Sequence, residues 1–247
     1  MQFRYQVLPV LNLATALMFV SAAQAQEGLP SKSEWSTEAS VSGFSDYVFR
    51  GLSQTLEDPA AQAEFVVGHE NGFYAGTFIS NIDFGDDADI EIDLFAGYSG
   101  GLGEAGYYDF SVLYYAYPGS DESYDYWEVM GELGAEFEFA TLSSGLYYSW
   151  DNFLQTGDAW YPYVGIDIPL PTIADVEWSL NGEVGYQTIE DEVTYGLPDY
   201  WTWQAGLTFT RGIVEVDLRY HDTDVLNGAS VDADAHFVGG VTLNFEF

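Results

Sequence analysis

The chain has 247 residues, of which 40 are acidic and only 5 are lysine or arginine, so its formal net charge is -35. This acidity excludes nucleic acid as a partner, because phosphate binding needs a basic surface, although a saline habitat would also explain it. A hydrophobic fraction of 47% is too high for a disordered chain, and the absence of cysteine excludes disulfides and thiolate metal sites.

The first 25 residues have the pattern of a secretory signal peptide. Arg4 is their only charge, an apolar run follows it from Val7 to Val20, and Ala23-Gln24-Ala25 fits a cleavage site. The run is shorter than the roughly 20 apolar residues of a membrane-spanning helix. We therefore expect cleavage after Ala25, a short lead over residues 26–34 and a single domain over residues 35–247.

From Trp35 onward the chain alternates apolar and polar residues, which indicates strands with one apolar and one polar face. The alternation is clearest from Trp127 to Phe139. The facing of residues 72–82 stays open, because both sides of that strand carry aromatic residues. In chain order, the expected strands cover residues 35–50, 62–69, 72–82, 90–98, 108–114, 127–139, 142–150, 160–168, 176–187, 201–210, 214–221 and 236–247.

The connections between these strands alternate between short turns and long loops. Short turns are expected at residues 70–72, 99–106, 140–141, 169–174 and 211–212, and long loops around Pro59, Asp86, Ser120, Asn152, Asp191 and Asn227. Outer-membrane barrels have short periplasmic turns and longer extracellular loops, and they must close because open sheet edges cannot face hydrocarbon. The sequence therefore predicts a closed antiparallel transmembrane β-barrel of about twelve strands in an up-and-down meander. A secreted β-sandwich is the soluble alternative.

The last strand supports a Gram-negative outer-membrane location. Its odd positions from Phe237 are apolar or glycine, and the chain ends on Phe247, which resembles the C-terminal signal read by the barrel-assembly machinery. We expect both termini in the periplasm, with lipids and that machinery as partners. Tryptophans near the strand ends fit aromatic girdles at the membrane interfaces; these are Trp35, Trp127, Trp150, Trp160, Trp201 and Trp203.

Several stretches resemble the TorF family of porins, formerly the conserved-hypothetical Gcw_chp family. The resemblance covers essentially the whole mature chain, and its most specific stretches are Ser45-Asp46-Tyr47-Val48-Phe49-Arg50-Gly51-Leu52-Ser53-Gln54-Thr55, residues 69–77, residues 80–83, residues 90–98 and Tyr126-Trp127-Glu128. It implies an outer-membrane barrel and suggests a pore, and it supplies no catalytic or binding residues.

The expected inner faces carry many acids. They include Glu64, Glu91, Asp93, Asp109, Glu128, Glu132, Glu177, Glu183, Glu215 and Asp217. Acidic linings favour cations, but one carboxylate acts on an ion 10 Å away through water by only about 0.4 kcal/mol. We therefore expect a porin for passive diffusion of small solutes with a modest cation preference. The alternative is that these acids only solvate and pack the lumen.

Two arginines are expected on the lumen side. Arg50 lies at the outer mouth, where it could form a constriction with Asp46 or, as the favoured interpretation, a structural ion pair that ties down residues 51–59. Arg219, between Asp217 and His221 on one face, has the same two interpretations. If Phe95, Tyr115 and Tyr147 fill the lumen, conduction would be negligible.

Other functions find weaker support. His69, His221 and His236 lack zinc-motif spacing, and the acidic loops 83–93 and 222–234 could hold calcium but do not fit the EF-hand pattern. We expect no metal and no cofactor.

An outer-membrane lipase or esterase would need a nucleophile such as Ser80 or Ser149, but no Gly-x-Ser-x-Gly motif is present, so no enzyme is expected. A non-conducting structural or adhesive barrel is the third class.

Overall fold

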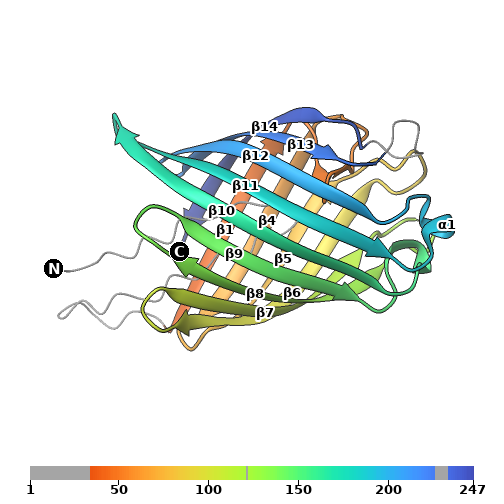
Figure 1. The fold of residues 1–247 in the computed structure, drawn as a ribbon, viewed down its shortest axis with the longest axis horizontal. Helices are drawn as coiled ribbons and strands as arrows, with labels where there is room; N and C mark the ends of the chain where they lie inside the picture. The colour runs from red at the N-terminus through yellow and green to blue at the C-terminus, as the bar shows by residue number, and fades with distance from the viewer. Residues whose placement is uncertain (1–33, 121, 226–232) are drawn as a thin grey trace.

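The computed structural model describes residues 34–120, 122–225 and 233–247, and the predicted signal peptide and residues 26–33 lie outside this part. The described residues form a closed antiparallel barrel of twelve strands (Figure 1). The predicted fold class is therefore confirmed. The strands are β1 (Trp35–Phe44), β4 (Ala60–His69), β5 (Phe73–Asn81), β6 (Ile90–Leu102), β7 (Gly106–Ala116), β8 (Tyr126–Glu136), β9 (Thr141–Ser149), β10 (Ala159–Ile173), β11 (Val176–Ile189), β12 (Tyr200–Arg211), β13 (Val214–Thr223) and β14 (His236–Glu246).

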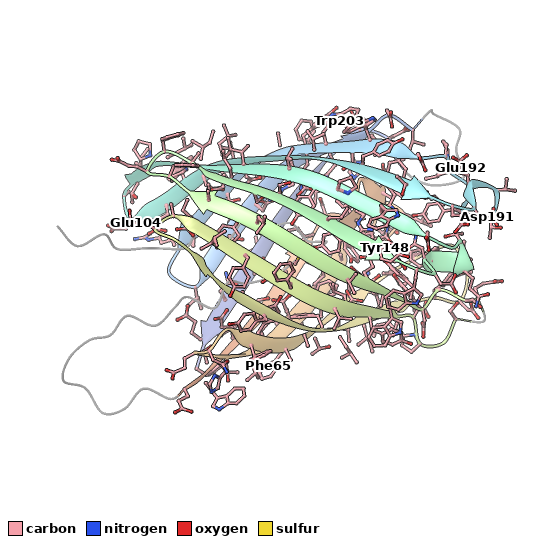
Figure 2. The ribbon with its side chains drawn as sticks, turned by 60° about the horizontal axis from the view of Figure 1, so that its bottom comes forward. Phe65, Glu104, Tyr148, Asp191, Glu192 and Trp203 are labelled. Atoms are coloured by element: carbon pink, nitrogen blue, oxygen red, sulfur yellow. The ribbon has the colours of Figure 1, made fainter. Side chains whose placement is uncertain are left out.

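The barrel closes where β1 pairs with both β4 and β14. Alternation along each strand sends one set of side chains outward and the other into the lumen. In β4, for example, Phe65 points away from the barrel (Figure 2) while Glu64 is buried inside. In β5, whose facing the sequence left open, Tyr74, Phe78 and Ser80 are the buried residues.

The two ends of the barrel differ. Short turns and the end of β14 lie at one end, which we call the short-turn end, and longer loops lie at the other, the long-loop end (Figure 1). The long-loop end carries a 3-10 turn η1 (Phe153–Gln155) and the short helix α1 (Glu192–Tyr195). No helix in residues 34–120, 122–225 and 233–247 is long and apolar enough to cross a membrane.

Two of the predicted turns are shorter than expected. β6 continues to Leu102 and β7 begins at Gly106, so most of residues 99–106 is strand. β10 continues through Pro169 and Pro171 to Ile173. Proline is tolerated there because β10 has passed the end of β9 beyond Asp167 and pairs only with β11. The actual turn is Ala174-Asp175, in which both residues have positive φ.

The predicted strand over residues 35–50 is wrong in its second half, because β1 ends at Phe44. Residues 45–59 leave the barrel wall, turn inward and form a small hairpin of β2 (Val48–Phe49) and β3 (Leu52–Ser53). We call residues 45–59 the inner hairpin. Its two-residue turn is Arg50-Gly51, with φ of 47° and 81°, the left-handed geometry favoured in tight hairpins.

A repeated aromatic unit marks the outer surface near the long-loop end. Trp160 stacks on Tyr148 of the preceding strand with ring centroids 4.1 Å apart, and the Tyr148 hydroxyl donates to Asp158 at 3.1 Å. The same Asp-x-Trp arrangement recurs at the start of β8 and β12. There the Tyr114 and Tyr186 hydroxyls donate to Asp125 and Asp199, and their rings lie 4.6 and 4.8 Å from those of Trp127 and Trp201.

Candidate functional site

The tip of the inner hairpin places one arginine in the middle of the lumen. Arg50 is buried and donates two hydrogen bonds to the Glu128 carboxylate on β8, at 2.9 and 2.8 Å. It also donates to the side-chain oxygen of Gln187 on β11 at 3.1 Å. The hairpin is therefore fastened to two separate parts of the barrel wall.

Aromatic rings enclose the same guanidinium. Its carbon lies 4.7 Å from the ring centroid of Phe49, 4.9 Å from that of Tyr147 and 4.5 Å from that of Tyr161. Cations over aromatic faces gain about 0.5 to 2 kcal/mol each, with the larger values at desolvated sites. Tyr115 adds a hydrogen bond from its hydroxyl to Glu128 at 3.0 Å. Charge, ring faces and hydrogen bonds thus all hold Arg50 in place.

Asp46 fastens the base of the inner hairpin. One of its carboxylate oxygens accepts from the hydroxyls of Ser53 and Thr55 at 2.7 and 2.8 Å, and the other lies 2.9 Å from Nε2 of His236 on β14. Nδ1 of His236 faces the Asp234 carbonyl at 2.6 Å, so only the doubly protonated ring can donate to both. Burial opposes ionisation of Asp46, but the hydrogen bonds from His236, Ser53 and Thr55 outweigh burial and lower its pKa.

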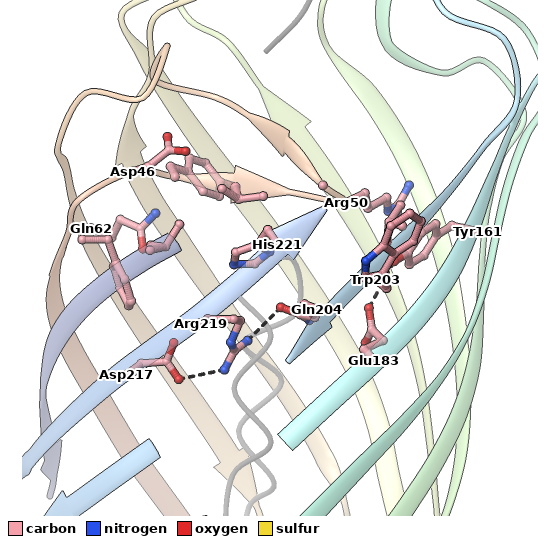
Figure 3. A pocket seen from close by; sticks show the side chains of 16 residues that line it. Asp46, Arg50, Gln62, Tyr161, Glu183, Trp203, Gln204, Asp217, Arg219 and His221 are labelled. Atoms are coloured by element: carbon pink, nitrogen blue, oxygen red, sulfur yellow. Dashed lines mark hydrogen bonds and ion pairs between the residues drawn. The ribbon is translucent and has the colours of Figure 1, made fainter. Parts of the chain in front are cut away.

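Arg50 and Asp46 have different partners in the structure. Asp46 and Arg50 both lie inside the barrel, but they do not form a constriction together, because Arg50 binds Glu128 and Asp46 binds His236. Arg219 on β13 binds Asp217 at 2.8 Å and donates to Gln204 on β12 at 3.2 Å (Figure 3). Arg219 is therefore held within the wall of the lumen.

The predicted acidic residues all occupy inward positions. Seven are buried, namely Glu64, Glu91, Asp93, Asp109, Glu128, Glu215 and Asp217, while Glu132, Glu177 and Glu183 are partly buried. Five of the ten accept hydrogen bonds from tyrosine hydroxyls, and of these tyrosines only Tyr115 was predicted to lie in the lumen. The pairs are Tyr47 with Glu91 (2.6 Å), Tyr74 with Asp109 (2.7 Å), Tyr115 with Glu128 (3.0 Å), Tyr161 with Glu183 (3.1 Å) and Tyr163 with Glu132.

Apolar side chains fill much of the remaining lumen. Tyr115 and Tyr147 are each only 2% exposed, and Phe95 packs against the same cluster. The inner hairpin contributes Tyr47 and Val48 to that cluster. Phe95, Tyr115 and Tyr147 therefore lie inside the lumen.

Two cavities lie on either side of the hairpin tip. The smaller, of about 40 Å³, is bordered by charged residues that include Asp46, Glu183 and Arg219 (Figure 3). The larger, of about 210 Å³, lies toward the long-loop end, and eight of its seventeen lining residues are aromatic. Arg50 lines both cavities, which places its side chain at their boundary.

The other candidate sites remain isolated. Among residues 34–120, 122–225 and 233–247, no three histidine, aspartate or glutamate side chains are arranged to hold a metal ion. His221 and His236 stack across the last hairpin with centroids 6.0 Å apart, and part of the loop 222–234 lies outside the described residues. The Ser80 hydroxyl donates to the Asn81 carbonyl at 2.9 Å, and Ser149 is buried.

Comparison with known proteins identifies both a family and a fold. A family model described as "Bacterial protein of unknown function (Gcw_chp)" matches residues 29–242, and no curated protein matches the sequence. Among solved structures, the KdgM porin in complex with disordered oligogalacturonate is similar with a TM-score of 0.56 and 9% identity, covering 85% of this chain and 99% of that one. The NanC porin is similar with a TM-score of 0.55 and 12% identity, covering 84% and 98%. These likenesses show a shared barrel fold with outer-membrane porins.

Proposed function

This chain belongs to the Gcw_chp family of bacterial proteins of unknown function, and from its barrel and inner hairpin we propose that it is an outer-membrane channel for small solutes, constricted by that hairpin. The observation that carries the proposal is a closed twelve-stranded barrel in which an inward hairpin holds Arg50 against Glu128. The likeness of the fold to the KdgM and NanC porins supports a channel, as does the resemblance to the TorF family.

A membrane location is supported by the outer surface of the barrel. Large apolar side chains are exposed on many strands, among them Phe65, Leu94, Phe110, Leu133 and Leu218. In water such a surface would associate nonspecifically, whereas in a bilayer it faces lipid. With short turns in the periplasm, Phe247 lies at the periplasmic end, where the barrel-assembly machinery would read it, and the inner hairpin enters from the extracellular side.

The lining supports a modest preference for cations. Acids outnumber bases on the inner faces, and the two inward arginines are each paired with a carboxylate. The KdgM porin was solved with oligogalacturonate, a polyanion that this lining would repel. We therefore propose neutral solutes and small cations as the cargo.

Planar-bilayer recording of the purified barrel tests the proposal. Phe44 and Ala60 are paired across β1 and β4, so residues 45–59 can be replaced by Asn-Gly without breaking the wall. We expect the wild type to conduct weakly with a cation-selective reversal potential, and the replacement variant to conduct several-fold more. A folded replacement variant without conductance, or a preference for anions, would contradict the proposal.

A non-conducting barrel is the second candidate, favoured by the apolar cluster that fills the lumen. It predicts that conductance stays at the baseline both in the wild type and after the hairpin is replaced. Liposome swelling over a series of neutral solutes separates the two candidates, because a channel passes the small members of the series.

A further inference from the structure

The larger cavity has the form of a ligand site. It lies between the inner hairpin and the long loops, and its volume is about 210 Å³. Tyr124 and Phe153 stack at its wall with centroids 4.4 Å apart and planes inclined by 7°, and Phe84 meets both rings edge-on at 5.4 and 5.5 Å. Flat aromatic walls of this kind suit a ring-shaped ligand.

A buried amide borders the same cavity. Asn152 is only 5% exposed and lines the cavity, and its side chain makes no capping hydrogen bond to the turn that follows it. An amide offers both donors and an acceptor. The cavity therefore presents an amide to a ligand that carries hydroxyls or a carbonyl.

Electrostatics favours a neutral ligand. The formal net charge of -35 repels anions, and the nearby loop adds Asp83 at the cavity and Asp86, which accepts from the Tyr124 hydroxyl. The floor of the cavity is Arg50, whose charge Glu128 already balances. A cation in the cavity would lie beside this guanidinium, which repels it, and the exposed Asp83 is the one carboxylate among the described residues of the lining.

Backbone strain gathers at the loops around this cavity. Leu56 and Glu57 in the inner hairpin, and Leu154 and Gln155 in the loop after β9, have φ between 51° and 62°. Such conformations of non-glycine residues cost about 1 to 3 kcal/mol each and are found at ligand sites. Leu56 and Leu154 both line the cavity.

From these observations we propose that the cavity binds a single neutral sugar ring of hexose size, with its C–H face on the aromatic wall and a hydroxyl on the Asn152 amide. An engineered cavity of about 150 Å³ binds benzene, so 210 Å³ suits one substituted ring. This inference rests on the proposed function, because it places a solute site at the extracellular mouth.

Isothermal titration of the detergent-solubilised barrel with D-glucose, D-glucosamine, D-glucuronate and phenol tests the inference. We expect glucose to bind more tightly than the charged sugars and phenol. Asn152→Leu should weaken glucose binding about tenfold, as loss of one buried hydrogen bond implies, and Phe153→Ala should weaken it further. Phe73→Ala is the matched control, because Phe73 contacts the ring of Tyr98 at the short-turn end, away from the cavity; it should leave binding unchanged.

Heat-modifiable migration on gels verifies that each variant is folded. If Phe153→Ala does not fold, Asn152→Leu alone provides the test. Tighter binding of glucosamine, glucuronate or phenol, or undiminished glucose binding by Asn152→Leu, would overturn the inference. Because titration needs no conduction, its failure is separable from that of the channel. A barrel that conducts without binding glucose overturns only this inference, and one that binds glucose without conducting overturns only the channel.

Discussion

The guanidinium of Arg50 and the carboxylate of Glu128 form a two-point ion pair across the lumen, 78 residues apart in the sequence. Neither partner is accessible to bulk water, so each depends on the other for charge compensation. The pair joins the tip of the inner hairpin to β8. It is therefore the contact that most directly keeps the hairpin inside the barrel.

Removing one member of this pair should both destabilise the barrel and raise conductance. Arg50→Ala leaves Glu128 buried without its cation, a loss of about 3 to 5 kcal/mol by analogy with other buried pairs. Arg50→Lys should recover only part of it, because lysine lacks the planar fork. Denaturant unfolding in micelles and single-channel recording measure the two effects. Arg211→Ala, at the exposed end of β12, is the control and should shift stability by less than about 0.5 kcal/mol.

Gly51 should not tolerate a side chain. Its φ is 81°, and a Cβ there would lie 2.4 Å from Cγ2 of Thr223, so Gly51→Ala adds a clash to the conformational cost of about 1 to 2 kcal/mol. Gly85→Ala is the matched control, since Gly85 has φ of 78° and open space around it. The expected result is a larger loss of stability and a larger rise in conductance for Gly51→Ala. Equal effects of the two substitutions would show that no clash occurs.

Acid should loosen the base of the inner hairpin. The folded pKa of Asp46 lies below its unfolded value of about 3.9, so its stabilisation is fully present above that value and is lost as the pH falls through the folded pKa. His236 binds Asp46 directly, Glu57 acts on His236 by charge, and the ring of His221 stacks on that of His236. We expect conductance to rise below about pH 4. Asp46→Asn should conduct more at neutral pH and respond less to acid, and an unchanged acid response would refute this assignment.

The Tyr148 and Trp160 pair should contribute to stability through its rings rather than its hydrogen bond. Aromatic pairs contribute about 0.5 to 1.5 kcal/mol beyond their burial, whereas the Tyr148 hydroxyl bond to Asp158 is exposed to solvent. Trp160→Ala should therefore cost more than 1 kcal/mol, and Tyr148→Phe less than about 0.5 kcal/mol. Unfolding from lipid vesicles measures both, and the reverse order would contradict the ranking.

The barrel could be predicted because the alternation of apolar and polar residues is visible within each strand and recurs from strand to strand. Each strand shows its own two-residue period, so Glu64 and Phe65 reveal their sides without knowledge of the partner strands. The inner hairpin could not be predicted this way, since Asp46 and Arg50 keep the alternation of β1 while the backbone leaves the wall. The local sign of the inner hairpin is the Arg50-Gly51 turn. Glu128, the partner of Arg50, is 78 residues away, so nothing in the sequence near the hairpin identifies it. The alternation also places the tyrosine partners of the acids on the inner face, but it does not show which tyrosine meets which acid.

The Asp-x-Trp unit recurs at Trp127, Trp160 and Trp201, once for every two strands. Each copy joins two strands across a long loop, and between successive copies the chain runs along one strand, through a short turn and back along the next. The wall is thus modular, with the hairpin as its unit of construction. Deleting β8 and β9, from one unit to the equivalent point of the next, would leave an even number of strands. The strands on either side of the deletion would still pair antiparallel, and the barrel would be narrower.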